Sequence, residues 1–195
     1  MTSESLAQEV ARHLTLREEK VVFAESCTAG LCAATLGQIP GISNYMCGSA
    51  VVYRADIKRR WLGVRRRTIK KFTTESHETA REMAVGIMQR YPEANWGVSI
   101  VGHLGPDAPP EKDGLIYICI VRRTIKGNLK IKDTQEHRLA GDGRSKRQEE
   151  AVEVVMTHLT RCLTKKSQSE AHKGDTRRKE DIEEQKPKKN RVVAS

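Results

Sequence analysis

A serine lies in the stretch 24–30, whose sequence is Ala-Glu-Ser-Cys-Thr-Ala-Gly. The stretch follows the apolar run 21–24 and precedes a helical pattern, so we expect Ser26 at a strand-to-helix junction. Free main-chain N–H groups at the start of a helix stabilise an oxyanion or a phosphate, and small residues let a substrate approach the backbone. Ser26 is therefore a candidate nucleophile for acyl transfer. On spacing alone, a Ser or Thr helix cap is the alternative, because caps are commoner than nucleophiles.

A serine hydroxyl needs a base near neutral pH, and a desolvated lysine can serve as one. Lys58 lies five residues after Tyr53, which ends a predicted strand. A turn would return the amine towards the strand end, where Tyr53 could orient Lys58 or relay a proton between Lys58 and Ser26. The two residues after Lys58 are arginines, which add positive charge nearby in the sequence. The alternatives are a half-buried strand aromatic for Tyr53 and a solvated helix charge for Lys58.

The elements that must position these residues alternate between helical and strand patterns, which favours an α/β fold, a three-layer α/β/α sandwich with a mixed sheet. Apolar residues at three- to four-residue spacing predict helices at 6–14, 29–38, 77–91 and 151–163. Continuous or alternating apolar runs predict strands at 21–24, 49–53, 96–101, 115–121 and 128–132. The last strand alternates polar and apolar residues, so we expect it half-exposed near the sheet edge.

Composition limits the classes of protein further. The 195 residues carry a formal net charge of +10, which favours anionic partners such as nucleotides or nucleic acid. Five scattered cysteines without a C-x-x-C pair argue against a disulfide framework or a zinc site, and we expect no metal and no cofactor. Without an apolar run of spanning length or a signal peptide, we expect a cytoplasmic protein with no membrane partner. We expect one domain at 1–164 and a disordered charged tail at 165–195, which has little to bury.

Six separated motifs resemble those of one family, the CinA C-terminal domain family of nicotinamide-nucleotide amidohydrolases. Residues 24–30 resemble its A-E-S-C-T-G-G, 39–43 its PG-x-S turn, 50–58 its V-x-Y-x-x-x-x-K element, 76–84 its S-x-x-x-A-x-x-M-A helix, 102–106 its G-x-A-G-P loop and 141–147 its G-D-R-x-x-x-R segment. The resemblance runs from about residue 3 to residue 163. Six motifs in the family's order are specific for the fold.

The resemblance implies a serine amidase that hydrolyses nicotinamide mononucleotide to nicotinate mononucleotide and ammonia, without a metal, in pyridine nucleotide recycling. Ser26 would be the nucleophile, with Lys58 and Tyr53 activating it. The resemblance and the helix-start position nominate these substrate-binding residues: Cys27, Thr28, Ala29, Gly30, Gly102, His103, Arg144 and Arg147. Main-chain N–H groups at 27–30 are the expected oxyanion donors, and the two arginines are candidates for the substrate phosphate or, alternatively, exposed charges at a helix start.

Some positions depart from the family pattern: Val101 replaces a common threonine, Asp107 a glycine, Ala29 the second glycine of the serine motif, and Gly143 is an insertion before Arg144. A run of eight basic residues without an acidic one also occupies 58–71. Val101, Asp107 and the basic run support a second hypothesis, a catalytically degraded member that binds nucleotides or nucleic acid. Ordinary solvated helix surface explains the basic run equally well. A nucleotide substrate remains the favoured partner, over nucleic acid, and a homo-oligomer is compatible with the sequence.

Overall fold

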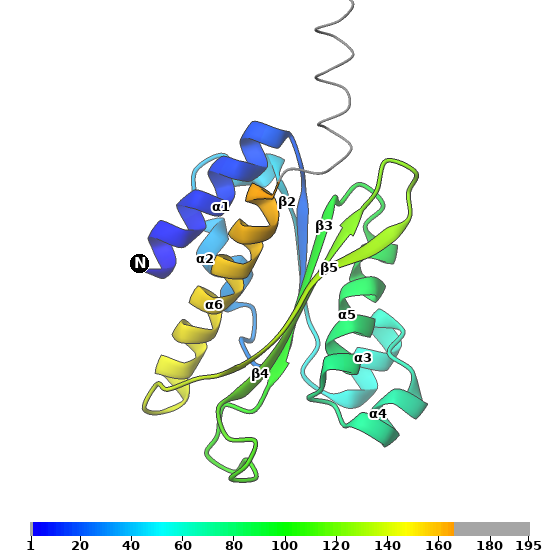
Figure 1. The fold of residues 1–195 in the computed structure, drawn as a ribbon, viewed down its shortest axis with the longest axis vertical. Coiled ribbons are helices and arrows are strands. Elements are labelled where there is room, and N and C mark those ends of the chain that lie inside the picture. The colour runs from blue at the N-terminus through cyan, green and yellow to red at the C-terminus, as the bar shows by residue number, and fades with distance from the viewer. Residues whose placement is uncertain (1, 166–195) are drawn as a thin grey trace, which may run out of the picture. The chain divides into compact units, whose positions relative to one another are not determined.

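The computed structural model describes residues 2–165, so the predicted tail lies outside the described residues except for Lys165. Residues up to Thr164 form one compact unit. Three helices cover one face of a central sheet (Figure 1), namely α1 (Ser3–Arg17), α2 (Leu31–Gly37) and α6 (Arg144–Thr164). The helices on the other face are α3 (Ala55–Leu62), α4 (Arg66–Phe72) and α5 (His77–Arg90). The predicted three-layer α/β sandwich is confirmed.

The sheet contains five strands in the order β2-β1-β3-β4-β5. They are β1 (Val21–Glu25), β2 (Met46–Val51), β3 (Trp96–Gly102), β4 (Leu115–Arg123) and β5 (Leu129–Arg138). The first three are mutually parallel, whereas β4 and β5 are antiparallel to their neighbours, so the sheet is mixed. Because the carboxyl ends of parallel strands meet at one edge of a sheet, the residues that follow β1, β2 and β3 are brought together there.

Strand β1 lies near the centre of the sheet and is buried along its whole length. Val21 and Phe23 belong to the core beneath α1 and α6, whereas Val22 and Ala24 belong to the core beneath α5. This alternation explains the continuous apolar run, because a strand covered by helices on both faces has no solvent side. Ser26 therefore directly follows a strand that is buried along its whole length.

Several element boundaries differ from those predicted. β2 ends at Val51 rather than Tyr53, and α6 begins at Arg144 rather than near 151 because its first two turns are polar and carry no apolar periodicity. β5 is an edge strand, as predicted, but continues to Arg138 through a polar stretch. No helix among residues 2–165 is both long and apolar enough to cross a membrane.

The helix that carries Lys58 is seated tightly against α5. A Cβ atom added at Gly86 would lie 1.9 Å from the main-chain oxygen of Leu62, at the end of α3. Only glycine permits this approach of two backbones. The contact places α3, and with it Lys58, at a defined distance from the sheet.

Candidate active site

Ser26 and Lys58 are in direct contact at the carboxyl edge of the sheet. The Lys58 Nζ donates to Ser26 Oγ at 2.9 Å and to the main-chain oxygen of Tyr53 at 2.8 Å. Ser26 is 5% exposed and Lys58 is fully buried. The main-chain N–H of Ser26 donates to the main-chain oxygen of Ile100, which extends the pairing of β1 and β3 by one residue and holds the serine beside the sheet. The structure thus brings together a hydroxyl and an amine that lie 32 residues apart.

Burial lowers the pKa of Lys58, because its charged form loses hydration inside the protein. Glu75 and the Cys27 thiol act in the opposite direction and more weakly. Arg59 and Arg60, whose positive charge was expected to assist, are exposed and do not account for the shift. A lowered pKa increases the fraction of neutral amine, the form that accepts a proton from a hydroxyl.

The thiol next to Ser26 is a poor nucleophile. Burial raises the pKa of Cys27 to about 12, so the thiol stays protonated near neutral pH. Its main-chain oxygen accepts a hydrogen bond from Gln148 Nε2 at 3.0 Å, which fastens the turn to α6. The Ser26 hydroxyl, which contacts the amine, is therefore a better candidate nucleophile than the thiol.

A buried carboxylate that sequence reasoning missed organises the turn after Ser26. Glu25 is inaccessible to solvent and accepts five hydrogen bonds of 2.7–3.1 Å. The donors are the hydroxyls of Thr28 and Ser49 and the main-chain N–H groups of Gly30, Cys32 and Ala33. Glu25 therefore ties the end of β1 to the start of α2 and to β2. The available signal was an acidic residue closing an apolar strand just before a helix start, where negative charge is favoured.

Glu25 also changes which N–H groups are available to a substrate. The N–H of Gly30 goes to Glu25, and that of Ala29 goes to the Ser26 oxygen at 3.1 Å. Among the hydrogen bonds of residues 2–165, the main-chain N–H groups of Cys27 and Thr28 have no oxygen acceptor. The expected set of oxyanion donors at 27–30 is thereby reduced to these two.

The turn contains one alanine in an unfavourable backbone conformation. Ala29 has φ +53°, in the left-handed region, and Gly30 follows with φ +99°. An L-residue with a Cβ is strained there, and glycine is not. Alanine in place of glycine at position 29 therefore has a conformational cost. The surrounding hydrogen bonds hold the turn in this conformation.

Tyr53 contributes two different groups to the site. Its main-chain oxygen accepts the hydrogen bond from Lys58, whereas its hydroxyl accepts one from Arg144 Nη2. The phenol hydroxyl is bonded to neither Lys58 nor Ser26, so the expected proton relay through it is replaced by direct contact between amine and serine. The side chain is 52% exposed, consistent with a position at the mouth of the site.

A cavity of about 230 Å³ opens beside Ser26. It is lined by Ser26, Cys27, Tyr53, Glu75, Gly102, His103, Leu104, Gly105, Asp107, Ala108 and Arg144. These residues come from the ends of the three parallel strands, from the loop after β3, from the start of α6 and, for Glu75, from the connection between α4 and α5. Thr28, Ala29 and Gly30 do not line the cavity, because they form the turn behind the serine.

The two candidate arginines have different environments. Arg144 lines the cavity and also donates to the Gly105 oxygen at 3.0 Å. Arg147 instead makes a bidentate ion pair with Asp113, at 2.6 and 2.8 Å, and donates to the Gly141 oxygen at 3.0 Å. The guanidinium of Arg147 is thus already engaged, and Arg147 does not line the cavity.

His103 and Glu75 face each other across the cavity wall. The His103 Nε2 lies 3.9 Å from a Glu75 carboxylate oxygen, and this buried nitrogen has no hydrogen-bond partner. Glu75 was not predicted, because an acidic residue before a helix cap gives no sequence signal for a cavity. The pair adds an unsatisfied imidazole nitrogen and a carboxylate to the wall of the cavity.

The positions that depart from the family pattern have unequal consequences. Val101 is fully buried in the core beneath α5 and does not line the cavity. Asp107 does line it, as an exposed carboxylate. Gly143 has φ +83°, a conformation that suits glycine directly before α6. Only Asp107 therefore changes the chemistry of the cavity itself.

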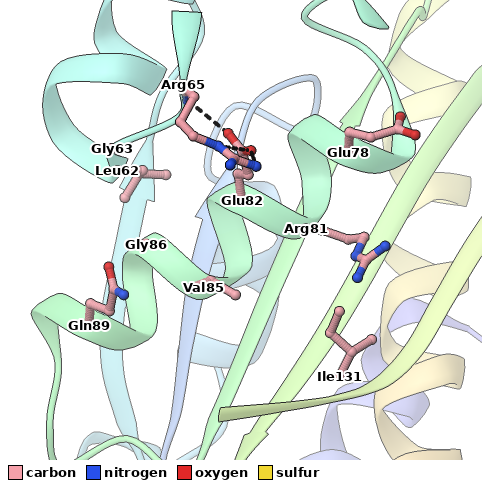
Figure 2. A pocket seen from close by; sticks show the side chains of 10 residues that line it. All are labelled: Leu62, Gly63, Arg65, Glu78, Arg81, Glu82, Val85, Gly86, Gln89 and Ile131. Carbon is pink, nitrogen blue, oxygen red and sulfur yellow. Dashed lines mark hydrogen bonds and ion pairs between the residues drawn. The ribbon is translucent and has the colours of Figure 1, made fainter. Parts of the chain in front are cut away.

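A second cavity of about 510 Å³ lies on the face of the sheet that α5 covers, between the α3–α4 connection, α5 and β5. Figure 2 shows that its charged groups include the hydrogen-bonded pair Arg65 and Glu82 and the side chains of Glu78 and Arg81. It contains no serine or cysteine. No group of three His, Cys, Asp or Glu side chains suited to a metal occurs within the described part of the chain. The cavity beside Ser26 remains the better candidate for chemistry.

Comparison with known proteins gives consistent matches. The CinA C-terminal domain family matches residues 3–163. A CinA-like protein of Dictyoglomus thermophilum is 39% identical over 140 residues, which make up 71% of this chain and 32% of that protein. A CinA-like protein of Desulforapulum autotrophicum is 39% identical over 116 residues, 60% of this chain and 27% of that protein. The chain thus spans about a third of the length of these curated relatives.

Solved structures match the fold over most of the chain. The competence/damage inducible protein CihA of Agrobacterium tumefaciens has a TM-score of 0.75 at 33% identity, covering 82% of this chain and 94% of that one. The competence damage-inducible protein A of Klebsiella pneumoniae has a TM-score of 0.78 at 25% identity, covering 86% of this chain and all of that one.

Proposed function

The chain belongs to the CinA C-terminal domain family, and from that premise we propose that it hydrolyses nicotinamide mononucleotide to nicotinate mononucleotide and ammonia. The observation that carries the proposal is the 2.9 Å contact between the buried Lys58 amine and the Ser26 hydroxyl. A serine paired with a desolvated lysine is an arrangement for acyl transfer that needs neither histidine nor a metal. The choice of the nucleotide follows from the family resemblance.

The reaction begins with neutral Lys58. Its amine takes the proton of Ser26 as the hydroxyl oxygen attacks the carboxamide carbon, and the carbonyl electron pair moves onto oxygen. The main-chain N–H of Cys27, a residue that lines the cavity, is the candidate to stabilise that oxyanion. As the tetrahedral intermediate collapses, the carbon–nitrogen bond breaks, the Lys58 ammonium returns a proton to the leaving nitrogen, and ammonia departs.

The second half of the reaction releases the acid. Lys58 takes a proton from a water molecule, whose oxygen attacks the acyl-serine ester. Collapse of this second intermediate breaks the ester bond and returns the proton to Ser26 Oγ. The balance is one amide and one water consumed, and one carboxylic acid and one ammonia formed.

Arg144 is the group in the cavity wall best suited to the substrate phosphate. Its guanidinium can offer paired N–H donors to phosphate oxygens, and its contacts with Tyr53 and Gly105 orient it. Asp107 lines the same cavity and opposes an anionic ligand, so we expect it to weaken phosphate binding. Arg144 and Asp107 would together set the affinity for the nucleotide.

The experiment is ammonia release from nicotinamide mononucleotide by purified full-length protein. We expect turnover by the wild type and a loss of at least about a thousandfold in Ser26→Ala and in Lys58→Met. Ser43→Ala is the matched control, because Ser43 is exposed and lies outside the cavity. A folded wild type without turnover would contradict the proposal and favour a degraded member that only binds.

Binding of the substrate to Ser26→Ala separates the two hypotheses further. Calorimetric titration of that variant with nicotinamide mononucleotide should give binding without heat of turnover. Binding by wild type and variant alike, with no ammonia from either, would support the nucleotide-binding alternative instead.

A further inference from the structure

Helices α3 and α4 carry a concentration of unpaired positive charge. Six of their side chains are exposed and form no ion pair with a carboxylate of residues 2–165: Arg59, Arg60, Arg66, Arg67, Lys70 and Lys71. We call these six the α3–α4 basic surface. Three residues separate the two helices, so their facing ends lie within about 15 Å of each other.

The other cations of this segment are already engaged. Lys58 is buried against Ser26, and Arg54 pairs with Asp56. Arg65 is bound by Glu82, as the dashed lines in Figure 2 mark. The α3–α4 basic surface is therefore what remains after internal ion pairing, and its charge is available to an external anion.

Two large aromatic side chains are exposed among these cations. Trp61 is 52% exposed at the end of α3, and Phe72 is 37% exposed at the end of α4. The Lys71 ammonium nitrogen lies 4.9 Å from the Phe72 ring centroid. Each helix thus presents an aromatic ring together with cations, and neither ring is needed to complete the core.

We propose that the α3–α4 basic surface binds single-stranded nucleic acid, with phosphates contacting the six cations and bases stacking on Trp61 and Phe72. A cationic surface that follows the backbone, combined with aromatic rings for the bases, is the recognition mode of single strands. Four of the six cations are arginines, whose guanidinium groups bind phosphate in bidentate geometry. This binding function is separate from the proposed amidase activity, because none of the six residues lines the cavity beside Ser26.

The rings favour a single strand over other polyanions. A DNA duplex keeps its bases stacked inside, so it would leave Trp61 and Phe72 without a role. An anionic membrane would attract the same cations, but a helix that lies on a membrane presents a continuous apolar face. The exposed apolar side chains of α3 and α4 are limited to these two rings.

The test is a fluorescence anisotropy titration of the full-length protein with a labelled oligothymidylate of about 20 nucleotides, at 50 to 200 mM salt. With six phosphate contacts, we expect the logarithm of the binding constant to fall with the logarithm of salt concentration with a slope of about −4. The variant Arg66→Glu/Arg67→Glu should flatten that slope by about 1.4. Trp61→Ala should weaken binding about tenfold with the slope unchanged, because stacking involves no counterion.

The matched control is Lys126→Glu/Lys130→Glu, which makes the same change in net charge with exposed lysines of the β4–β5 hairpin. We expect it to bind nearly as the wild type does. Equal weakening by both double variants would overturn the proposal in favour of general attraction to the net charge, and so would tighter binding to phosphatidylserine-rich vesicles than to the oligonucleotide. Ammonia release should be unchanged in Arg66→Glu/Arg67→Glu, so the amidase and the binding surface fail or succeed independently.

Discussion

The Lys58 amine lies 2.9 Å from the Ser26 hydroxyl oxygen, and the lysine side chain is fully buried. The contact joins α3 to the end of the central strand β1. The same amine also donates to the main-chain oxygen of Tyr53, which follows the end of β2. Three segments therefore meet at one nitrogen atom, and the stability of the site and its protonation state are coupled.

Lys58→Met should change how stability depends on pH. The pKa of Lys58 is near 10.5 in the unfolded chain and lower in the folded protein. Between those two values the unfolded state binds the extra proton, so the free energy of unfolding of the wild type rises with pH across that window. Relative to Lys58→Met, the wild type should therefore gain stability as pH increases towards 10.5.

Urea unfolding of both proteins at several pH values from 7 upwards measures this difference. Lys126→Met is the control, because Lys126 is exposed and its removal should give a difference from the wild type that does not vary in this way. A constant offset between wild type and Lys58→Met at every pH would contradict the prediction.

Glu25→Gln should destabilise the protein and slow turnover. The substitution replaces one acceptor oxygen by an amide group that faces N–H and O–H donors, and the site is buried. We expect a loss of about 1–3 kcal/mol in the free energy of unfolding. Turnover should fall more than the Michaelis constant rises, because Glu25 holds the turn that follows Ser26 and does not line the cavity.

Urea unfolding and steady-state kinetics check both effects, with Glu149→Gln on the exposed side of α6 as control. Unchanged stability in Glu25→Gln would mean that the hydrogen bonds of the carboxylate contribute nothing net.

Ala29→Gly should stabilise the protein. Ala29 has φ +53°, where a Cβ atom costs about 1–2 kcal/mol, and glycine removes that strain while adding some entropy to the unfolded chain. The expected net gain is about 0.5–1 kcal/mol. Ala34→Gly, at an exposed position inside α2, should instead lose about 1 kcal/mol. Thermal unfolding of both variants tests the pair, and shifts of the same sign would refute the assignment of strain to position 29.

Arg144→Ala and Arg147→Ala should separate binding from stability. Arg144 lines the cavity, so its loss should raise the Michaelis constant for the nucleotide by about tenfold or more and leave the melting temperature nearly unchanged. Arg147 pairs with Asp113, so its loss should lower the melting temperature with a smaller effect on the Michaelis constant. The opposite assignment of effects would show that Arg147, and not Arg144, contacts the phosphate.

The sequence alone determined the five strands and four of the six α-helices of residues 2–165, together with the location of the serine, whereas α3 and α4 were not predicted as helices. The apolar run of β1, the helical spacing of α5 behind Ser76 and the alternation in β5 are local signals, and each produced the predicted element. They depend on residues within one or two turns of the chain, which is the range over which periodicity carries information. The candidate site residues were also named from local motifs, and the pairing of Ser26 with Lys58 was among them.

Only the tertiary structure decided which polar atoms meet. In the structure Lys58 donates to the main-chain oxygen of Tyr53 and not to its hydroxyl. Arg147 pairs with Asp113, whereas Arg144 lines the cavity. The tertiary structure also gave Glu25 five hydrogen-bond donors, drawn from α2, from β2 and from the turn between β1 and α2. Such contacts depend on the relative placement of elements distant in the chain and on which groups are buried, and neither is encoded in local residue spacing.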